Sequence, residues 1–96
     1  MGSFQRTALI TGGATGIGLA SAQAFSKAGY NVVLTDLEQK VVQDVANTIK
    51  GPTLAIKLNV CDQTSIYVAF KEGERVFGQI DVLHANAGVS LSLIHI

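Results

Sequence analysis

The residues with the clearest capacity for chemistry are the glycines of the segment from Thr11 to Gly18, which reads Thr-Gly-Gly-Ala-Thr-Gly-Ile-Gly. The segment lies between a short apolar run at 8–10 and a helical pattern from about residue 17 to 28. A glycine-rich loop in that position exposes backbone N–H groups at a helix N-terminus, where the helix dipole also attracts phosphate. It therefore predicts a pyrophosphate-binding loop. The alternative is a flexible glycine turn that binds nothing.

Three glycines of this loop have separate expected tasks. Gly12 would allow the tight turn, and Gly16 would let a pyrophosphate approach the main chain without meeting a Cβ atom. Gly18 would let the helix pack closely on the sheet. The residue directly after Gly16 is Ile17 and not the lysine that a P-loop requires, so a loop that binds a nucleoside triphosphate is not indicated.

An acidic residue follows at the distance that a dinucleotide-binding fold requires. Asp36 ends a second apolar run at 32–35, eighteen residues after Gly18, where a carboxylate accepts hydrogen bonds from the ribose hydroxyls. A 2′-phosphate would be repelled by Asp36 and Glu38, and no basic residue lies nearby before Lys40. These charges favour NAD over NADP. The alternative interpretation of Asp36 is a solvated aspartate in a turn.

Apolar runs and helical periods alternate along the whole chain, which is typical of βα units over a parallel sheet. Strands are expected at 8–10, 32–35, 54–60 and 82–85, the third at a sheet edge because polar residues interrupt it. The first helix is expected to bury Ile17, Ala20, Ala24 and Ala28. A second is expected from about 41 to 49. A third, capped by Asp62, is expected to bury Ile66, Ala69, Phe70, Gly73, Val76 and Phe77. We therefore predict an α/β fold, the N-terminal half of a Rossmann-type doubly wound parallel sheet (βαβαβαβ, strand order 3-2-1-4), truncated after the fourth strand.

Composition excludes several classes of protein. The chain has 96 residues, with seven basic and seven acidic side chains, so charge alone draws it to neither nucleic acid nor an anionic membrane. The uncharged run from Thr7 to Ser26 is interrupted by glycines and threonines, which argues against a membrane span. The single Cys61 cannot form an internal disulfide, so a cytoplasmic location is expected. His84 and His95 lack the partners of a metal site, and no metal is expected.

Several motifs together resemble the short-chain dehydrogenase/reductase family. They are Thr-Gly-x-x-x-Gly-x-Gly at Thr11 to Gly18, Asp36, Asn59-Val60-Cys61-Asp62, and Asn86-Ala87-Gly88. The resemblance covers residues 6 to about 89 and has two departures. Asn59 stands where the family usually has Asp, and Ala85 replaces the first Asn of Asn-Asn-Ala-Gly.

The resemblance implies a set of cofactor-binding residues. The Ile17 amide would contact the pyrophosphate, Asp36 the adenosine ribose, and Asn59-Val60 the adenine. The segment from Asn86 to Gly88 would line the cofactor after the fourth strand. The full expected set is Gly12, Gly16, Ile17, Gly18, Asp36, Asn59, Val60, Asn86, Ala87 and Gly88.

The activity implied by the resemblance is NAD-dependent interconversion of an alcohol and a carbonyl by hydride transfer, in a parent protein that forms a homo-oligomer. The family's catalytic Ser and Tyr-x-x-x-Lys follow Asn-Ala-Gly, so the 96-residue chain is expected to lack them and to be inactive alone. Tyr67 and Lys71 match the Tyr-x-x-x-Lys spacing but precede Asn86, and we interpret them as a surface pair. Alternatives are a non-catalytic nucleotide-binding or interaction module and, more distantly, a methyltransferase.

The apolar ending, Leu-Ser-Leu-Ile-His-Ile, departs from this pattern. We expect an NAD-binding half-domain over 1–90. Residues 91–96 are expected to be either the translation of a sequencing adapter or a disordered tail. The alternative is a genuine short product with an apolar loop after Val89.

The isolated 96-residue chain is predicted to be marginally stable. A parallel sheet that stops at its fourth strand leaves an apolar edge at 82–85, which is prone to pairing with other chains. Circular dichroism on heating, with light scattering, should give a broad transition or association. A cooperative thermal transition of a monomer would contradict this prediction.

Overall fold

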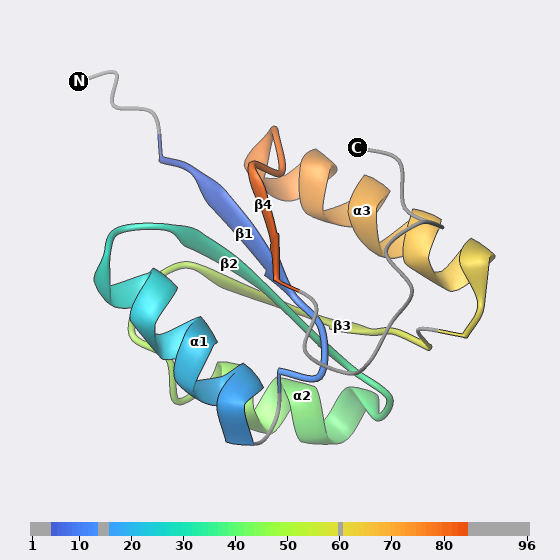
Figure 1. Ribbon diagram of the computed structural model, residues 1–96, viewed down its shortest axis with the longest axis horizontal. Coiled ribbons are helices and arrows are strands. Elements are labelled where there is room, and N and C mark those ends of the chain that lie inside the picture. The colour runs from blue at the N-terminus through green and yellow to red at the C-terminus, as the bar shows by residue number, and fades with distance from the viewer. Residues whose placement is uncertain (1–4, 14–15, 60, 85–96) are drawn as a thin grey trace.

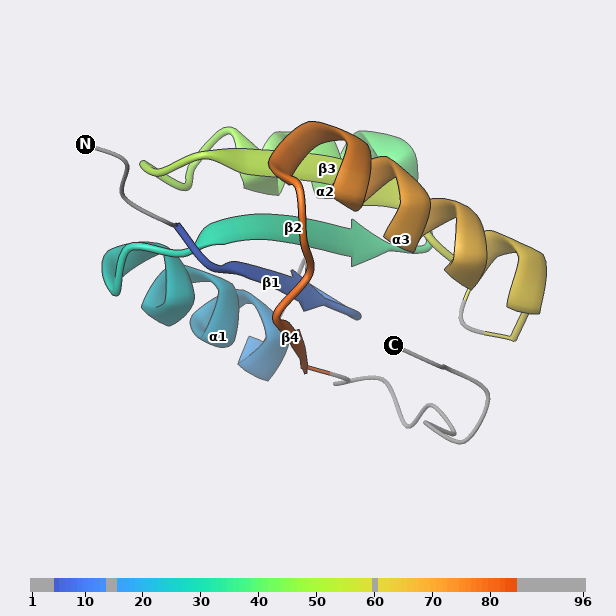
Figure 2. The ribbon, with the colours of Figure 1, turned by 90° about the horizontal axis from the view of Figure 1, so that it is seen from above.

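Strands and helices alternate along the chain in the computed structural model, which describes residues 5–13, 16–59 and 61–84. The elements are β1 (Thr7–Ile10), α1 (Gly16–Lys27), β2 (Asn31–Asp36), α2 (Gln39–Ala46), β3 (Thr53–Lys57), α3 (Gln63–Phe77) and β4 (Val82–His84). The strands form one parallel sheet in the order β3-β2-β1-β4 (Figure 2). The predicted α/β fold and strand order are confirmed. No helix within the described ranges is long and apolar enough to cross a membrane.

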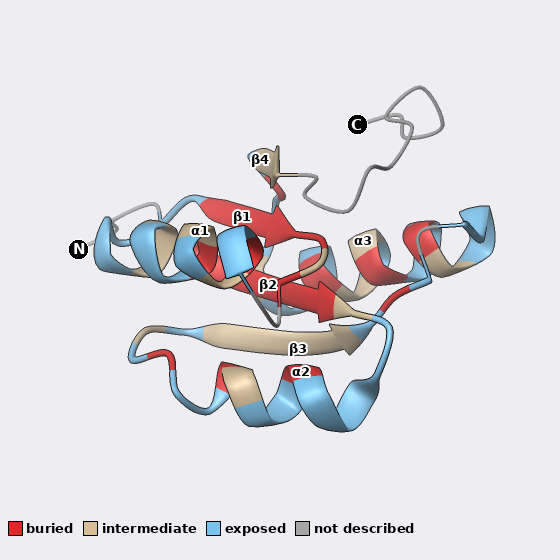
Figure 3. Cartoon of the chain, turned by 60° about the horizontal axis from the view of Figure 1, so that its bottom comes forward, coloured by how far each residue is buried: buried red, intermediate tan, exposed pale blue. Residues whose placement is uncertain are grey.

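Two helices cover one face of the sheet and one helix covers the other. Figure 1 shows α1 and α2 on one side and α3 on the opposite side. Side chains alternate between these faces: Leu34 packs in the core under α1 and α2, whereas Val33 packs with Ile80 on the face covered by α3. The middle strands β1 and β2 are therefore buried on both faces, and the outer strands are half-buried (Figure 3). Burying each large aliphatic side chain stabilises the fold by about 1.5–3 kcal/mol.

The predicted buried face of α1 is wrong. Ile17 is 72% exposed, and the alanines expected beside it lie on the surface as well. The buried residues are Gly18 and Ala22, and Phe25 packs against the same core. Small apolar residues occur all round this helix, so two faces satisfy the helical period. The face that contains Gly18 and the large Phe25 packs on the sheet, because glycine permits close approach and phenylalanine fills the space beyond it.

The third helix begins and packs largely as predicted. The Asp62 carboxylate caps it by accepting a hydrogen bond from the Thr64 amide at 2.9 Å, and Ile66, Ala69 and Gly73 are buried. A Cβ atom at Gly73 would lie 2.9 Å from Ile80 Cδ1, so glycine lets α3 approach the sheet. Val76 is the exception: it is 43% exposed, whereas we expected it to be buried.

The outer edge of β3 is covered by a side chain from α2. The Gln39 amide accepts a hydrogen bond from the Lys57 N–H at 3.0 Å and donates one to the Ala55 carbonyl at 3.4 Å. These groups face away from β2, because backbone groups of alternate residues point to opposite sides of a strand and β2 bonds Pro52 and Leu58. Gln39 therefore occupies the bonding positions that another strand would use. The strand ends at Lys57 rather than at Val60 as predicted, and Val60 lies outside the described residues.

Replacing Gln39 by Leu is predicted to increase self-association. The substitution removes both edge hydrogen bonds and leaves backbone groups available to a second chain. Light scattering at rising concentration should show more dimer or aggregate for Gln39→Leu than for Gln43→Leu. Gln43 lies one turn later on the same helix, and its side-chain amide donates a hydrogen bond to Asn47 Oδ1 rather than to β3. Equal association of the two variants would contradict an edge-covering role.

Gly13 makes a close contact that the sequence did not indicate. Its amide donates a hydrogen bond to the Thr35 carbonyl at 2.8 Å. A Cβ atom at this position would collide with Leu34 Cδ1 and lie 3.0 Å from Leu34 Cγ. Leu34 is fully buried, so its side chain has little room to move.

Gly13→Ala is predicted to lower the free energy of unfolding by about 1–3 kcal/mol, the usual cost of overpacking a core. Leu34→Val removes the colliding end of the side chain, so the double variant should lose less stability than the two single losses added together. The free energies of unfolding can be measured by denaturant titration of the unchanged protein, the two single variants and the double variant. Simple additivity would show that the Gly13–Leu34 contact does not limit the site.

Candidate functional site

The carboxyl ends of all four strands lie along one edge of the sheet. Parallel register pairs Ile10 with Leu34 on one side and with His84 on the other, and pairs Asp36 with Lys57. The glycine segment therefore begins in the middle of this edge. In open α/β sheets, ligands bind outside the carboxyl ends of the strands.

Two backbone hydrogen bonds fix the glycine loop between its neighbouring strands. The Thr11 amide donates to the His84 carbonyl at 3.1 Å, and the Gly13 amide donates to the Thr35 carbonyl at 2.8 Å. The start of the loop at Thr11 is thus bonded to β4, and Gly13, two residues later, is bonded to β2. Ala14 and Thr15 lie outside the described residues.

The main chain is open where α1 begins. Gly12 and Gly16 have φ values of 61° and 59°, a left-handed conformation that favours glycine. Gly16 and Ile17 are exposed, and nothing lies within 4 Å of the place where a Cβ atom of Gly16 would be. The first N–H groups of a helix lack intrahelical partners. This arrangement can receive an anionic group at the helix N-terminus, and the buried Gly18 packs α1 on the sheet.

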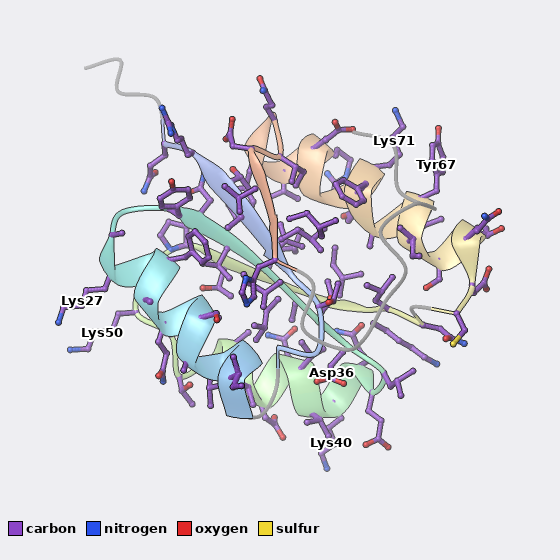
Figure 4. All side chains as sticks on the ribbon, viewed as in Figure 1. Lys27, Asp36, Lys40, Lys50, Tyr67 and Lys71 are labelled. Carbon is purple, nitrogen blue, oxygen red and sulfur yellow. The ribbon has the colours of Figure 1, made fainter. Side chains whose placement is uncertain are left out.

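Asp36 lies beside this loop, because the carbonyl of its neighbour Thr35 accepts a hydrogen bond from the Gly13 amide. The residue is half-buried at the end of β2, and its Oδ1 atom accepts a hydrogen bond from the Leu37 amide at 2.7 Å. Figure 4 shows Asp36 and Lys40 at the same end of the molecule, away from Lys27 and Lys50. The predicted glycines and the predicted carboxylate thus come together.

Lys57 is a charged neighbour that the sequence analysis missed. It is the register partner of Asp36 on the adjacent strand, and paired residues of parallel strands point to the same face of the sheet. Along the sequence, the basic residue that follows Asp36 is Lys40. The parallel register brings a cation from twenty-one residues later along the chain.

Asn59 lies just beyond β3 and is exposed. Its side-chain Oδ1 atom accepts a hydrogen bond from the backbone N–H of Cys61 at 3.0 Å. Its backbone N–H donates a hydrogen bond to Ser65 Oγ at 3.0 Å. An amide oxygen has two lone pairs, so Oδ1 can accept one more hydrogen bond. Val60, Asn86, Ala87 and Gly88, which complete the predicted site, lie outside the described residues.

Tyr67 and Lys71 form a surface pair, as predicted. Lys71 Nζ lies 5.4 Å from the centre of the Tyr67 ring, and both side chains point away from the body of the protein in Figure 4. On the same helix, a hydrogen bond from Arg75 holds the pKa of the Glu72 carboxyl below its usual value. Within residues 5–13, 16–59 and 61–84, no three His, Cys, Asp or Glu side chains come together as a metal site.

Comparison with known proteins finds dehydrogenases and a reductase that are similar to this chain. The chain is 36% identical over 86 residues to the NAD-dependent glycerol dehydrogenase of Listeria innocua, and 39% identical over 84 residues to the galactitol 2-dehydrogenase of Agrobacterium fabrum. It resembles the crystal structure of the 3-ketoacyl-(acyl-carrier-protein) reductase from Brucella melitensis complexed with NADH, with a TM-score of 0.78 and 30% identity over 84% of this chain.

These matches cover most of this chain but only part of each relative. The two dehydrogenase matches include 90% and 88% of the chain and 34% and 33% of the relatives, and the match to the reductase includes 34% of that chain. The chain thus spans about a third of the length of these proteins. The family model described as short chain dehydrogenase matches residues 6–95. With the strand order and glycine loop described above, this match shows that the chain belongs to the short-chain dehydrogenase family.

Proposed function

We propose that the chain is the cofactor-binding part of an oxidoreductase that uses NAD to interconvert an alcohol and a carbonyl. The observation that carries the proposal is the open main chain at Gly16 and Ile17, which lies at a helix N-terminus next to the strand that ends in Asp36. A dinucleotide has a diphosphate and a ribose that suit these two features.

The residues of the chain would bind and orient the cofactor. The amides at the start of α1 would contact the diphosphate, and Gly12 and Gly16 would keep side chains out of its way. Asp36 would accept hydrogen bonds from the adenosine ribose, and Asn59 with Val60 would flank the adenine. The segment 86–88 would line the cofactor beyond β4. When bound, the nicotinamide supplies or accepts the hydride.

Two charges next to the ribose act in opposite directions on cofactor choice. Asp36 would repel a 2′-phosphate, whereas Lys57 on the neighbouring strand would attract one. Asp36 borders the glycine loop directly, and Lys57 belongs to the outer strand, so we expect the carboxylate to dominate. The NAD-dependent relative and the NADH-bound reductase support this choice.

The proposed substrate is a small alcohol or the corresponding carbonyl compound. The relatives named for glycerol, galactitol and meso-2,3-butanediol support this class. We place the catalytic Ser, Tyr and Lys in a part of the parent outside this chain, so the chain alone should be inactive. The remaining features of the proposal are a cytoplasmic, homo-oligomeric parent with no nucleic-acid or membrane partner, and a cofactor-binding unit over 1–90.

NADH is predicted to bind the full-length parent more tightly than NADPH. Asp36→Asn should weaken NADH binding about 10-fold or more, because hydrogen bonds to a charged group contribute about 1.5–3 kcal/mol. The same change should reduce the preference for NADH over NADPH, because it removes the repulsion between Asp36 and the 2′-phosphate of NADPH. Lys57→Gln should increase that preference, because it weakens the binding of NADPH. Dissociation constants for both cofactors can be measured by fluorescence titration.

Lys50→Gln is the matched control, because it removes the same charge at the other end of the molecule (Figure 4). It should leave both dissociation constants within about twofold of the parent's. Tighter binding of NADPH by the parent would overturn the assignment of NAD. Failure of both cofactors to bind would overturn the proposed function.

A further inference from the structure

We propose that His84 is a positioning residue of the cofactor site, which holds helix α1 and the glycine loop in place through a hydrogen bond with Ser21. The proposal rests on the function proposed above. It assigns a role to a histidine that the sequence analysis left without one.

His84 bonds to both sides of the glycine loop. Its carbonyl accepts the Thr11 amide at 3.1 Å, where the loop leaves β1. Its ring Nε2 atom lies 3.0 Å from Ser21 Oγ, and this hydrogen bond joins β4 to the second turn of α1. The loop and the first turn of α1 lie between these two contacts. A shift of α1 relative to β4 would therefore change the distance between Ser21 and His84.

The His84 ring is also held from the side. Phe25, one turn after Ser21 on α1, has its ring centre 6.4 Å from that of His84 with the planes inclined at 60°. Phe25 in turn contacts Tyr30 edge-on at 4.9 Å. Ser21 and Phe25 thus define one position for the imidazole against the helix.

The short strand β4 explains why a side-chain contact matters here. It has three residues and pairs with β1 through Ala8, Leu9 and Ile10. Few backbone hydrogen bonds therefore determine where its carboxyl end lies. Asn86, the first of the residues proposed to line the cofactor after β4, follows two positions later. Through His84, the carboxyl end of β4 is joined to the helix that would bind the diphosphate.

Two amide substitutions separate the bonding atom from the bulk of the ring. The Gln amide nitrogen can occupy the position of the histidine Nε2 atom, whereas the shorter Asn amide reaches only the position of Nδ1. His84→Asn and Ser21→Ala should each weaken NADH binding to the full-length parent about 3- to 10-fold, and His84→Gln should stay within about twofold. The double variant Ser21→Ala/His84→Asn should bind no more weakly than the poorer single variant.

Fluorescence titration with NADH, with thermal unfolding of each variant, tests the proposal. Val82→Ala is the control, because Val82 lies on the same strand and packs in the α1 core without contacting Ser21 by hydrogen bonding. It should lower the unfolding temperature while leaving NADH binding within about twofold. If His84→Asn fails to fold, the other two variants still test the proposal. Ser21→Ala should weaken NADH binding, and His84→Gln should leave it within about twofold.

Several results would overturn the proposal while leaving the proposed function intact. They are NADH binding unchanged in all variants, additive losses in the double variant, equal losses for Asn and Gln, or a loss in Val82→Ala as large as in Ser21→Ala. Parent protein that does not bind NADH would instead overturn the proposed function together with this inference.

Discussion

The hydrogen bond from the Gly13 amide to the Thr35 carbonyl determines how the site is assembled. It draws the glycine loop against β2, so that Asp36 borders the loop and α1 starts at the same edge of the sheet. The close approach is open to glycine because a Cβ atom would meet the buried Leu34. A turn held farther from β2 would separate the helix N-terminus from the carboxylate, and the two could not contact one dinucleotide.

The sequence predicted the order of the elements because the signals for a parallel sheet are local. Ala8 to Ile10 and Val32 to Thr35 form short apolar runs, Gly16 and Gly29 mark the two ends of α1, and Asp62 caps α3. The buried face of α1 was not predictable in the same way. Its small side chains satisfy the helical period on more than one face, and the choice depends on how closely the helix approaches the sheet.

The candidate site also contains some residues that could be identified from the sequence and others that could not. Gly16 and Asp36 could be identified because the spacing between glycine loop and acid is a property of one βα unit. Lys57 and the Ser21–His84 contact could not, because they depend on which strands are neighbours and on their register. Gly13 was also missed: the pair Gly12-Gly13 was visible, but the contact with Leu34 exists only in the folded chain.

The central claim is that the start of α1 and the end of β2 together bind a dinucleotide, and backbone amide shifts in an NMR titration with NADH test it most directly. The account predicts that the largest shifts fall on Gly16, Ile17, Gly18 and Asp36. Shifts confined to the opposite end of the sheet, around Lys27 and Lys50, with the amides of residues 16–18 unchanged, would contradict it.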